Sequence, residues 1–108
     1  LSEFDITQKI IESLSNVCTR SVLFSVKNES KDVTQIADEL KISLSTVYKT
    51  LSTLEDLALA EIDRYVISPE GKKIKLYRSR IGKVEITLEN LSPTLVLHPN
   101  DSDSSISN

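Results

Sequence analysis

Apolar side chains recur every three or four residues between residues 5 and 59, which is the spacing of the buried face of an α-helix. Polar stretches interrupt this pattern three times, so it predicts four helices. Short polar side chains that can accept a hydrogen bond from a first helical turn stand near each expected start. The predicted N-caps are Asp5, Asn16, Thr34 and either Ser43 or Ser45.

The apolar positions of these four stretches form the predicted core. Each helix would bury one face, and the last two would pack against each other as a short helix followed by a longer one. The residues on these faces are Ile6, Ile10, Ile11 and Leu14; Val17, Cys18, Val22, Leu23 and Val26; Ile36, Ala37 and Leu40; and Val47, Leu51, Leu54 and either Leu57 or Ala58.

After Ala60 the spacing of apolar positions shifts toward two, the period of a half-buried strand. β-Forming residues up to Ile67 are followed by a turn sequence at 68–71 and by an alternating stretch at 73–77, so we expect a hairpin. The two faces of its second strand would be Ile74 and Leu76 on one side, and Lys73, Lys75 and Tyr77 on the other.

Two further strands are predicted beyond this hairpin. Gly82 breaks the run, and the stretch from Lys83 to Glu89 then alternates cleanly. A short edge strand at Leu95–Leu97 would follow between two prolines. From about residue 99 the chain is polar and low in complexity, so we expect a mobile tail.

The order of short helix, three-residue turn, longer helix and basic hairpin is typical of a helix-turn-helix with a wing. We therefore predict a mainly α fold with a small antiparallel β wing (α+β), an extra N-terminal helix and a C-terminal strand. Residues 1–90 would form this domain, with the helix-turn-helix at about 33–59 and the wing at about 60–80. Residues 91–108 would be a C-terminal extension.

Composition narrows the classes of function. The chain has 108 residues with one Cys and one His, so we expect no disulfide, no zinc site, no other metal and no cofactor. It has neither an apolar run near the roughly 20 residues that cross a bilayer nor a basic, apolar leader. We therefore expect no membrane association and a soluble, cytoplasmic protein.

The formal net charge of −3 argues against a protein that simply coats nucleic acid. The distribution changes this picture, because residues 67–90 carry six cations and three anions while residues 31–66 carry four and seven. The positive charge is concentrated on the predicted wing. We expect weak non-specific attraction to DNA and early loss of binding as salt rises.

The longer helix would expose hydroxyl groups, a phenol and one Lys if its apolar face is buried. Such groups can bond base edges or phosphates in a major groove, and helix N-termini offer N–H groups to phosphate. Lys side chains on the hairpin could reach neighbouring phosphates. The candidate DNA-binding residues are Thr34, Ser43, Ser45, Thr46, Tyr48, Lys49, Ser52, Thr53, Lys72, Lys73 and Lys75.

Several short matches across residues 16–80 resemble the winged helix-turn-helix transcriptional regulators of bacteria and archaea, most closely their ArsR-like and TrmB-like groups. The matching stretches are Asn16-Val17-Cys18-Thr19-Arg20, Ser45-Thr46-Val47-Tyr48-Lys49, Leu51, Leu54-Glu55, Ala58-Leu59 and Glu70-Gly71-Lys72-Lys73. The resemblance implies a sequence-specific regulator that binds double-stranded DNA and is associated with the nucleoid of a prokaryote. Its recognition helix at 43–59 would enter the major groove, and its wing at 68–80 would contact the backbone or minor groove.

The resemblance also implies roles for single residues. Ser45, Thr46 and Lys49 would read base edges, and Tyr48 would contact bases or backbone. Many relatives have Gly where this chain has Lys41 and Ala58. A left-handed residue other than Gly costs roughly 1 kcal/mol at such a turn.

A homodimer is expected, because one reading helix seldom supplies enough affinity. The segments Phe4–Leu14 and Val84–Leu88 carry apolar stripes outside the motif and are the candidate dimer contacts. The alternative is a winged helix that contacts protein in a transcription or chromosome-maintenance complex, which the acidic helical half favours. Exposed Leu or Phe on the reading face would distinguish it, and the sequence places neither there.

An enzyme is the third class. The sequence contains no nucleophile elbow, glycine-rich phosphate loop or metal-spaced pair, and no small-molecule ligand is evident. We therefore expect no catalytic residues.

Overall fold

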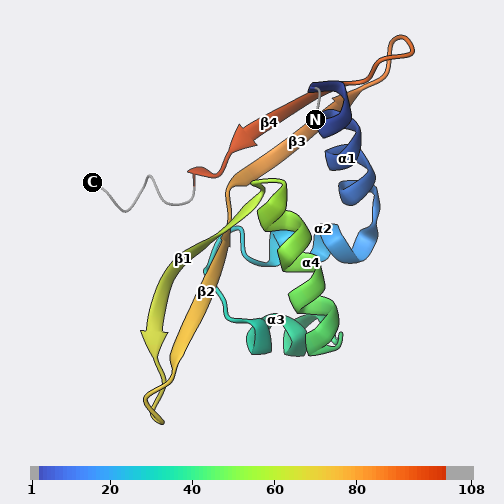
Figure 1. Ribbon diagram of the computed structural model, residues 1–108. Coiled ribbons are helices and arrows are strands. Elements are labelled where there is room, and N and C mark those ends of the chain that lie inside the picture. The colour runs from blue at the N-terminus through green and yellow to red at the C-terminus, as the bar shows by residue number, and fades with distance from the viewer. Residues whose placement is uncertain (1–2, 102–108) are drawn as a thin grey trace.

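A computed structural model describes residues 3–101 of the chain. Four helices precede four strands, and Figure 1 shows two hairpins that project from the helical part in different directions. The elements are α1 (Glu3–Ser15), α2 (Val17–Ser25), α3 (Val33–Leu40), α4 (Leu44–Asp56), β1 (Ala60–Ile67), β2 (Lys73–Ser79), β3 (Ile81–Thr87) and β4 (Thr94–Pro99). The α+β winged helix-turn-helix architecture is confirmed.

Two predicted helix starts are confirmed by their capping bonds. The Asn16 side chain accepts a hydrogen bond from the Thr19 N–H at 3.0 Å. Ser43, rather than Ser45, caps α4 and accepts from the Thr46 N–H at 3.2 Å. Each cap satisfies a donor that the first helical turn leaves unpaired.

The other two predicted caps are wrong. The helical backbone of α1 begins at Glu3, so Asp5 lies inside the first turn. Helix α3 begins at Val33, one residue before Thr34, and is capped by Asp32. Asp32 and Gln35 form a capping box with two reciprocal bonds of 2.9 Å, which satisfies two backbone donors where a single Thr hydroxyl would satisfy one.

Both positions where relatives carry Gly have left-handed backbone here, with φ of 58° at Lys41 and 59° at Ala58. Ala58 donates to the Glu55 carbonyl at 2.9 Å, and Leu59 donates to the Leu54 carbonyl at 2.8 Å. These are the two bonds that end a helix in a Schellman motif. The chain therefore makes both turns at the conformational cost that glycine would avoid.

The predicted helical stripes form most of the core. Two expected members are exposed instead: Ile6 lies near the free end of α1, and Val17 is the first residue of α2 at the corner between two helices. Residues from the strands complete the core. The buried cluster contains Ile10, Leu14, Val22, Leu23, Val26, Ile36, Ala37, Val47, Leu51, Leu54, Leu59, Ala60, Tyr77 and Ile81.

The β1–β2 hairpin has the predicted alternation of faces. Tyr65 pairs with Lys75 and Ile67 pairs with Lys73, so these four side chains share one face of the hairpin. Tyr77 lies at the base of the same face but is buried in the core. The Lys-bearing face therefore turns toward the helices.

The segment before α3 adds a third, very short strand to this hairpin. Lys31 and Tyr77 exchange two backbone hydrogen bonds of 3.1 and 2.8 Å. The Lys31 side chain forms an ion pair of 2.7 Å with Glu39 of α3. These contacts attach α3 to the wing.

The second hairpin begins earlier than the sequence predicts. Gly82 does not break the strand: it lies inside β3, and β3 pairs with β4 on both sides of it, Ile81 with Pro99 and Lys83 with His98. The predicted edge strand is present as β4, paired with β3. Within the predicted tail, the Asn100 side chain donates to the carbonyls of Lys27 and Ser79 at 2.8 and 2.9 Å, whereas residues 102–108 lie outside the described part.

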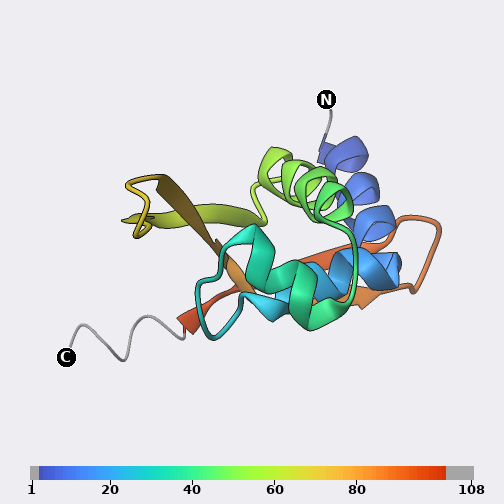
Figure 2. The same ribbon diagram turned by 90° about the horizontal axis from the view of Figure 1, so that it is seen from below.

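Figure 2 shows the β1–β2 hairpin projecting from the side of the helices opposite α1. No helix among the described residues is both long and apolar enough to cross a membrane. Within residues 3–101, His, Cys, Asp and Glu side chains form no group of three or more that could hold a metal ion.

Candidate nucleic-acid interface

The orientation of α4 is fixed by its buried face. Val47, Leu51 and Leu54 are buried against the other helices, so the opposite face of α4 is left to solvent. The predicted site residues on α4 are accordingly exposed, except that Thr46 is half-buried. The exposed members are Ser45, Tyr48, Lys49, Ser52 and Thr53.

Several hydroxyl groups of α4 take part in local hydrogen bonds. The Ser43 hydroxyl accepts from the Thr46 N–H and donates to Thr46 Oγ1 at 2.9 Å, and it lies 3.1 Å from Ser45 Oγ. Thr53 Oγ1 donates to the Lys49 carbonyl at 3.3 Å. Ser43 therefore serves the helix as its cap, while the Thr46 hydroxyl accepts the bond from Ser43 and can still donate its own hydrogen.

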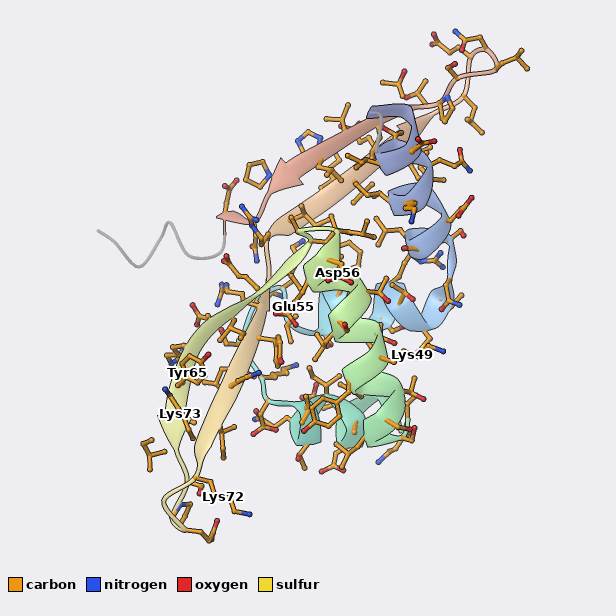
Figure 3. The ribbon with its side chains drawn as sticks, in the orientation of Figure 1. Lys49, Glu55, Asp56, Tyr65, Lys72 and Lys73 are labelled. Carbon is orange, nitrogen blue, oxygen red and sulfur yellow. The ribbon has the colours of Figure 1, made fainter. Side chains whose placement is uncertain are left out.

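The two ends of α4 differ in charge. Lys49 lies in the first half of the helix, whereas Glu55 and Asp56 close its second half (Figure 3). Asp56 is seven residues after Lys49 and so lies on the same exposed face two turns later. The two carboxylates would repel phosphates, and sequence reasoning missed them although their spacing from Lys49 is visible in the chain.

The wing presents Lys side chains together with apolar ones. Lys73 Nζ lies 4.5 Å from the centre of the Tyr65 ring, a cation–π contact (Figure 3). Lys72 lies at the tip of the hairpin, where its N–H donates to Ser68 Oγ at 3.0 Å. Lys72, Lys73 and Lys75 are all exposed, so their charges are available to a partner.

A groove of about 540 Å³ separates the wing from the helix-turn-helix. It brings together five of the predicted site residues from α3, α4 and the wing. Its lining consists of Asp32, Val33, Thr34, Tyr48, Lys72, Lys73, Ile74, Lys75 and Tyr77. Thr53 instead lines a hollow beside α1, so the structure does not bring it to this groove.

Tyr77 is a groove residue that the sequence analysis did not select. Its side chain is only 5% exposed. Burial raises the pKa of the Tyr77 phenol, and the nearby charge of Glu55 raises it further. The phenol therefore stays protonated, and Tyr77 adds no negative charge to a groove lined by Lys side chains.

Thr34 is exposed in the first turn of α3, at one edge of the groove. Because Asp32 caps α3, a carboxylate already occupies the N-terminal end of this helix. This negative charge offsets the positive end of the helix dipole. Thr34 can still offer its hydroxyl, but the helix end itself is a weaker phosphate site than the sequence suggested.

Comparison with known proteins decides the family. Residues 20–61 match the model of the bacterial regulatory proteins of the arsR family. An uncharacterized HTH-type transcriptional regulator of Methanocaldococcus jannaschii is 33% identical over 81 residues, which are 75% of this chain and 83% of that protein. The chain belongs to the ArsR-like family of winged helix-turn-helix transcriptional regulators. It is therefore a DNA-binding regulator of transcription.

In this ArsR-like regulator, the span matched by the family model runs from α2 to the second residue of β1. It includes the whole helix-turn-helix formed by α3 and α4. Most of the wing and all of the β3–β4 hairpin lie beyond it. The family match therefore covers the reading helix α4, whereas the chemistry of the two hairpins depends on residues outside the matched span.

Proposed function

We propose that this regulator recognises a specific sequence in double-stranded DNA, with the first half of α4 in the major groove and the wing at 68–80 on the backbone or minor groove. The observation that supports this docking is the shared groove: the Lys-bearing face of the wing and Tyr48 of α4 border it together. Glu55 and Asp56 would keep the far end of α4 away from the phosphates.

The side chains divide into two roles under this proposal. Ser45, Thr46 and Lys49 would read base edges, and Tyr48 and Ser52 would contact bases or the adjoining backbone. Lys72, Lys73 and Lys75 would contact phosphates without reading sequence, and Thr34 would add a hydroxyl contact to the backbone. Ser43 and Thr53 would act on helix geometry through their local hydrogen bonds.

A homodimer is part of the proposal, because two reading helices double the contacts with a symmetric site. Ile10 and Leu14 of the α1 stripe are buried in the protein's own core and cannot serve a partner. The side chain of Phe4 lies outside the described part. Exposed apolar residues remain on α1 and on the β3–β4 hairpin, and these would form the dimer contact: Ile6, Ile86, Leu88 and Leu97.

The domain division follows from these roles. Residues 1–90 would form the DNA-binding domain, and residues 91–108 would extend it. Strand β4 lies in this extension and pairs with β3, so the extension would also contribute to the dimer contact.

The test is a fluorescence titration of duplex DNA that has been selected from genomic fragments. Thr46→Ala and Lys49→Ala should each lower the preference for the selected site over a scrambled duplex by about tenfold, because each removes a base contact. Thr87→Ala and Lys83→Ala make the same chemical changes on the β3–β4 hairpin and should leave this preference intact. Unchanged preference in both α4 variants would contradict the proposed reading face.

A further inference from the structure

Ile67 has an unusual position for a large apolar side chain. It is the last residue of β1, next to the wing turn, and 68% of it is exposed. Single exposed apolar residues are common on protein surfaces. Ile67 is different because the aromatic ring of Tyr65 is also exposed on the same face, two residues earlier.

The pairing of the strands shows where this apolar pair points. Ile67 is directly opposite Lys73, and Tyr65 is directly opposite Lys75, so all four side chains lie on one face. Tyr77 and Ile62 continue that face into the core. The apolar pair therefore shares the Lys-bearing face of the wing, but neither of its residues lines the groove beside α4.

The apolar side chains on the opposite face of the hairpin are less exposed than Ile67. Val66, between Tyr65 and Ile67, pairs with Ile74 on the other side of the hairpin and is 36% exposed. Leu76 continues that face and is buried. The more exposed of the two apolar neighbours, Ile67, is thus on the Lys-bearing face.

We propose that Ile67, with the Tyr65 ring beside it, is the apolar contact of the wing with the sugar walls of the DNA minor groove. This inference rests on the proposed DNA docking. The charge on either side supports DNA as the occupant, because Lys72 and Lys73 adjoin Ile67 at the tip and would hold the two phosphate backbones that flank the groove.

An apolar contact would also compensate for the weak electrostatic attraction between DNA and a chain of negative net charge. A chain of net charge −3 gains little from counterion release beyond its few wing Lys side chains. Burying an apolar side chain against deoxyribose stabilises the complex in a way that salt does not screen. Apolar side chains are common in proteins that bind the minor groove, where many are inserted between base steps and bend the duplex.

The test compares Ile67→Ser with Val66→Ser in the full chain, titrated on one selected duplex at several salt concentrations. Ile67→Ser should weaken binding about tenfold at every salt concentration and leave the slope of log affinity against log salt unchanged. Ile67→Leu should restore most of the affinity. Val66→Ser should bind like the parent protein, because Val66 is on the other face.

Hydroxyl-radical footprinting locates the contact, since the radical attacks sugars from the minor groove. The parent protein should protect sugars beside the major-groove site of α4, and Ile67→Ser should lose this protection alone. Binding and footprint like those of the parent in Ile67→Ser would overturn the inference and leave the proposed function standing. A parent protein that binds no duplex would overturn the proposed function itself.

A protein contact at Ile67 has a separate signature. If Ile67→Ser changed the sedimentation of the free protein, Ile67 would belong to an interface between copies of the chain, and the minor-groove contact would be wrong. The parent and the variant should sediment alike.

Discussion

The two hairpins of this regulator are similar in backbone and different in chemistry. Each consists of two antiparallel strands with one register irregularity near its base, and only Arg80 separates β2 from β3. Near its tip the wing carries Lys72, Lys73 and Lys75 with one acidic residue, Glu70, whereas Glu61, Asp63 and Arg64 lie nearer its base. On the β3–β4 hairpin, Glu85 and His98 form a close pair beside Lys83, so charges of both signs lie together.

Their exposed apolar residues differ as well. On the wing these residues lie between Lys side chains, whereas the β3–β4 hairpin exposes Leu88 and Leu91 at its tip, with no cation from 84 to 101. A two-stranded hairpin is too small to bury both faces by itself. Which partner covers each hairpin therefore depends on the side chains that remain outside; in the proposed docking these partners are DNA for the wing and a second copy of the chain for β3–β4.

The largest effect is expected from charges placed on the β3–β4 hairpin. Ile86→Asp together with Leu88→Asp should convert the dimer into a monomer, because carboxylates cannot be buried unpaired in the contact. Affinity for a duplex with two half-sites should fall about 100-fold. Sedimentation and titration measure the two effects.

The matched control is Val66→Asp on the wing, which should leave the protein dimeric. Binding to a single half-site by the Ile86→Asp, Leu88→Asp protein should match that of the parent. Sedimentation of the parent as a monomer at micromolar concentration, with DNA binding intact, would refute the dimer and with it this contrast between the hairpins.

Removing charge from the wing should give the next largest effect. Lys72→Ala with Lys73→Ala should weaken binding to all duplexes, by about 50-fold at moderate salt, and make the salt slope shallower by up to about two. Lys83→Ala on the other hairpin should change neither quantity. An equal effect of Lys83→Ala would show that the two hairpins share one DNA surface.

The two hairpins also differ in how the chain enters them. Ala58, with left-handed backbone, leads into β1, whereas β3 follows β2 directly and no non-glycine residue of 81–99 has positive φ. Ala58→Gly should relieve this strain and raise the free energy of unfolding by about 1 kcal/mol. Chemical denaturation measures the change.

The contrasting variant is Ala37→Gly, in the interior of α3, which should lower the stability by about 1 kcal/mol or more. Loss of stability in Ala58→Gly would mean that the entropy of the unfolded chain outweighs the strain at this turn.

The smallest expected effect is a change in the local stability of the β3–β4 hairpin at low pH. The hydrogen bond from His98, with the charge of Lys83, holds the pKa of the Glu85 carboxyl below its ordinary value. A carboxyl group whose pKa is lower in the folded than in the unfolded state stabilises the fold at pH values above its unfolded pKa. This contribution is lost as the pH falls through the folded pKa. As the pH is lowered from about 7 to about 3, amide protection factors, which correct for the slower intrinsic exchange in acid, should fall more in β3–β4 than in the wing.

Glu85→Gln should remove this difference between the hairpins, and Glu89→Gln, also exposed near the tip of the second hairpin, should not. An equal change in protection factor in both hairpins of the parent as the pH falls would show that the Glu85–His98 pair contributes nothing to the local stability.

Local rules predicted much of the fold, and their failures have physical causes. Asn16 and Ser43 cap helices as expected. Thr34 does not cap α3, because Asp32 and Gln35 together satisfy two backbone donors at the start of that helix. The sequence predicts a strand break at Gly82, but the pairing of β3 with β4 continues past this residue to Ile81 and Pro99. In both cases the structure depends on a contact with another residue that the local sequence pattern did not include.

The candidate site was predicted less completely than the fold. The sequence supplied the hydroxyls of α4 and the Lys side chains of the wing, but not Tyr77, Ile67 or the opposing charge of Glu55 and Asp56. Tyr77 alternates with Leu76 like any strand residue, so its position in the chain does not reveal that it lines the groove.

The sequence by itself determined the order of the helices and hairpins and the alternation of side chains along each strand, because helical and strand periods depend on neighbours in the chain. The tertiary structure decided which face of the wing meets the helices. An alternation is unchanged when a strand is turned over, so only contacts between distant segments, such as Lys31 with Tyr77, select one face. These contacts place the Lys-bearing face of the wing beside α4.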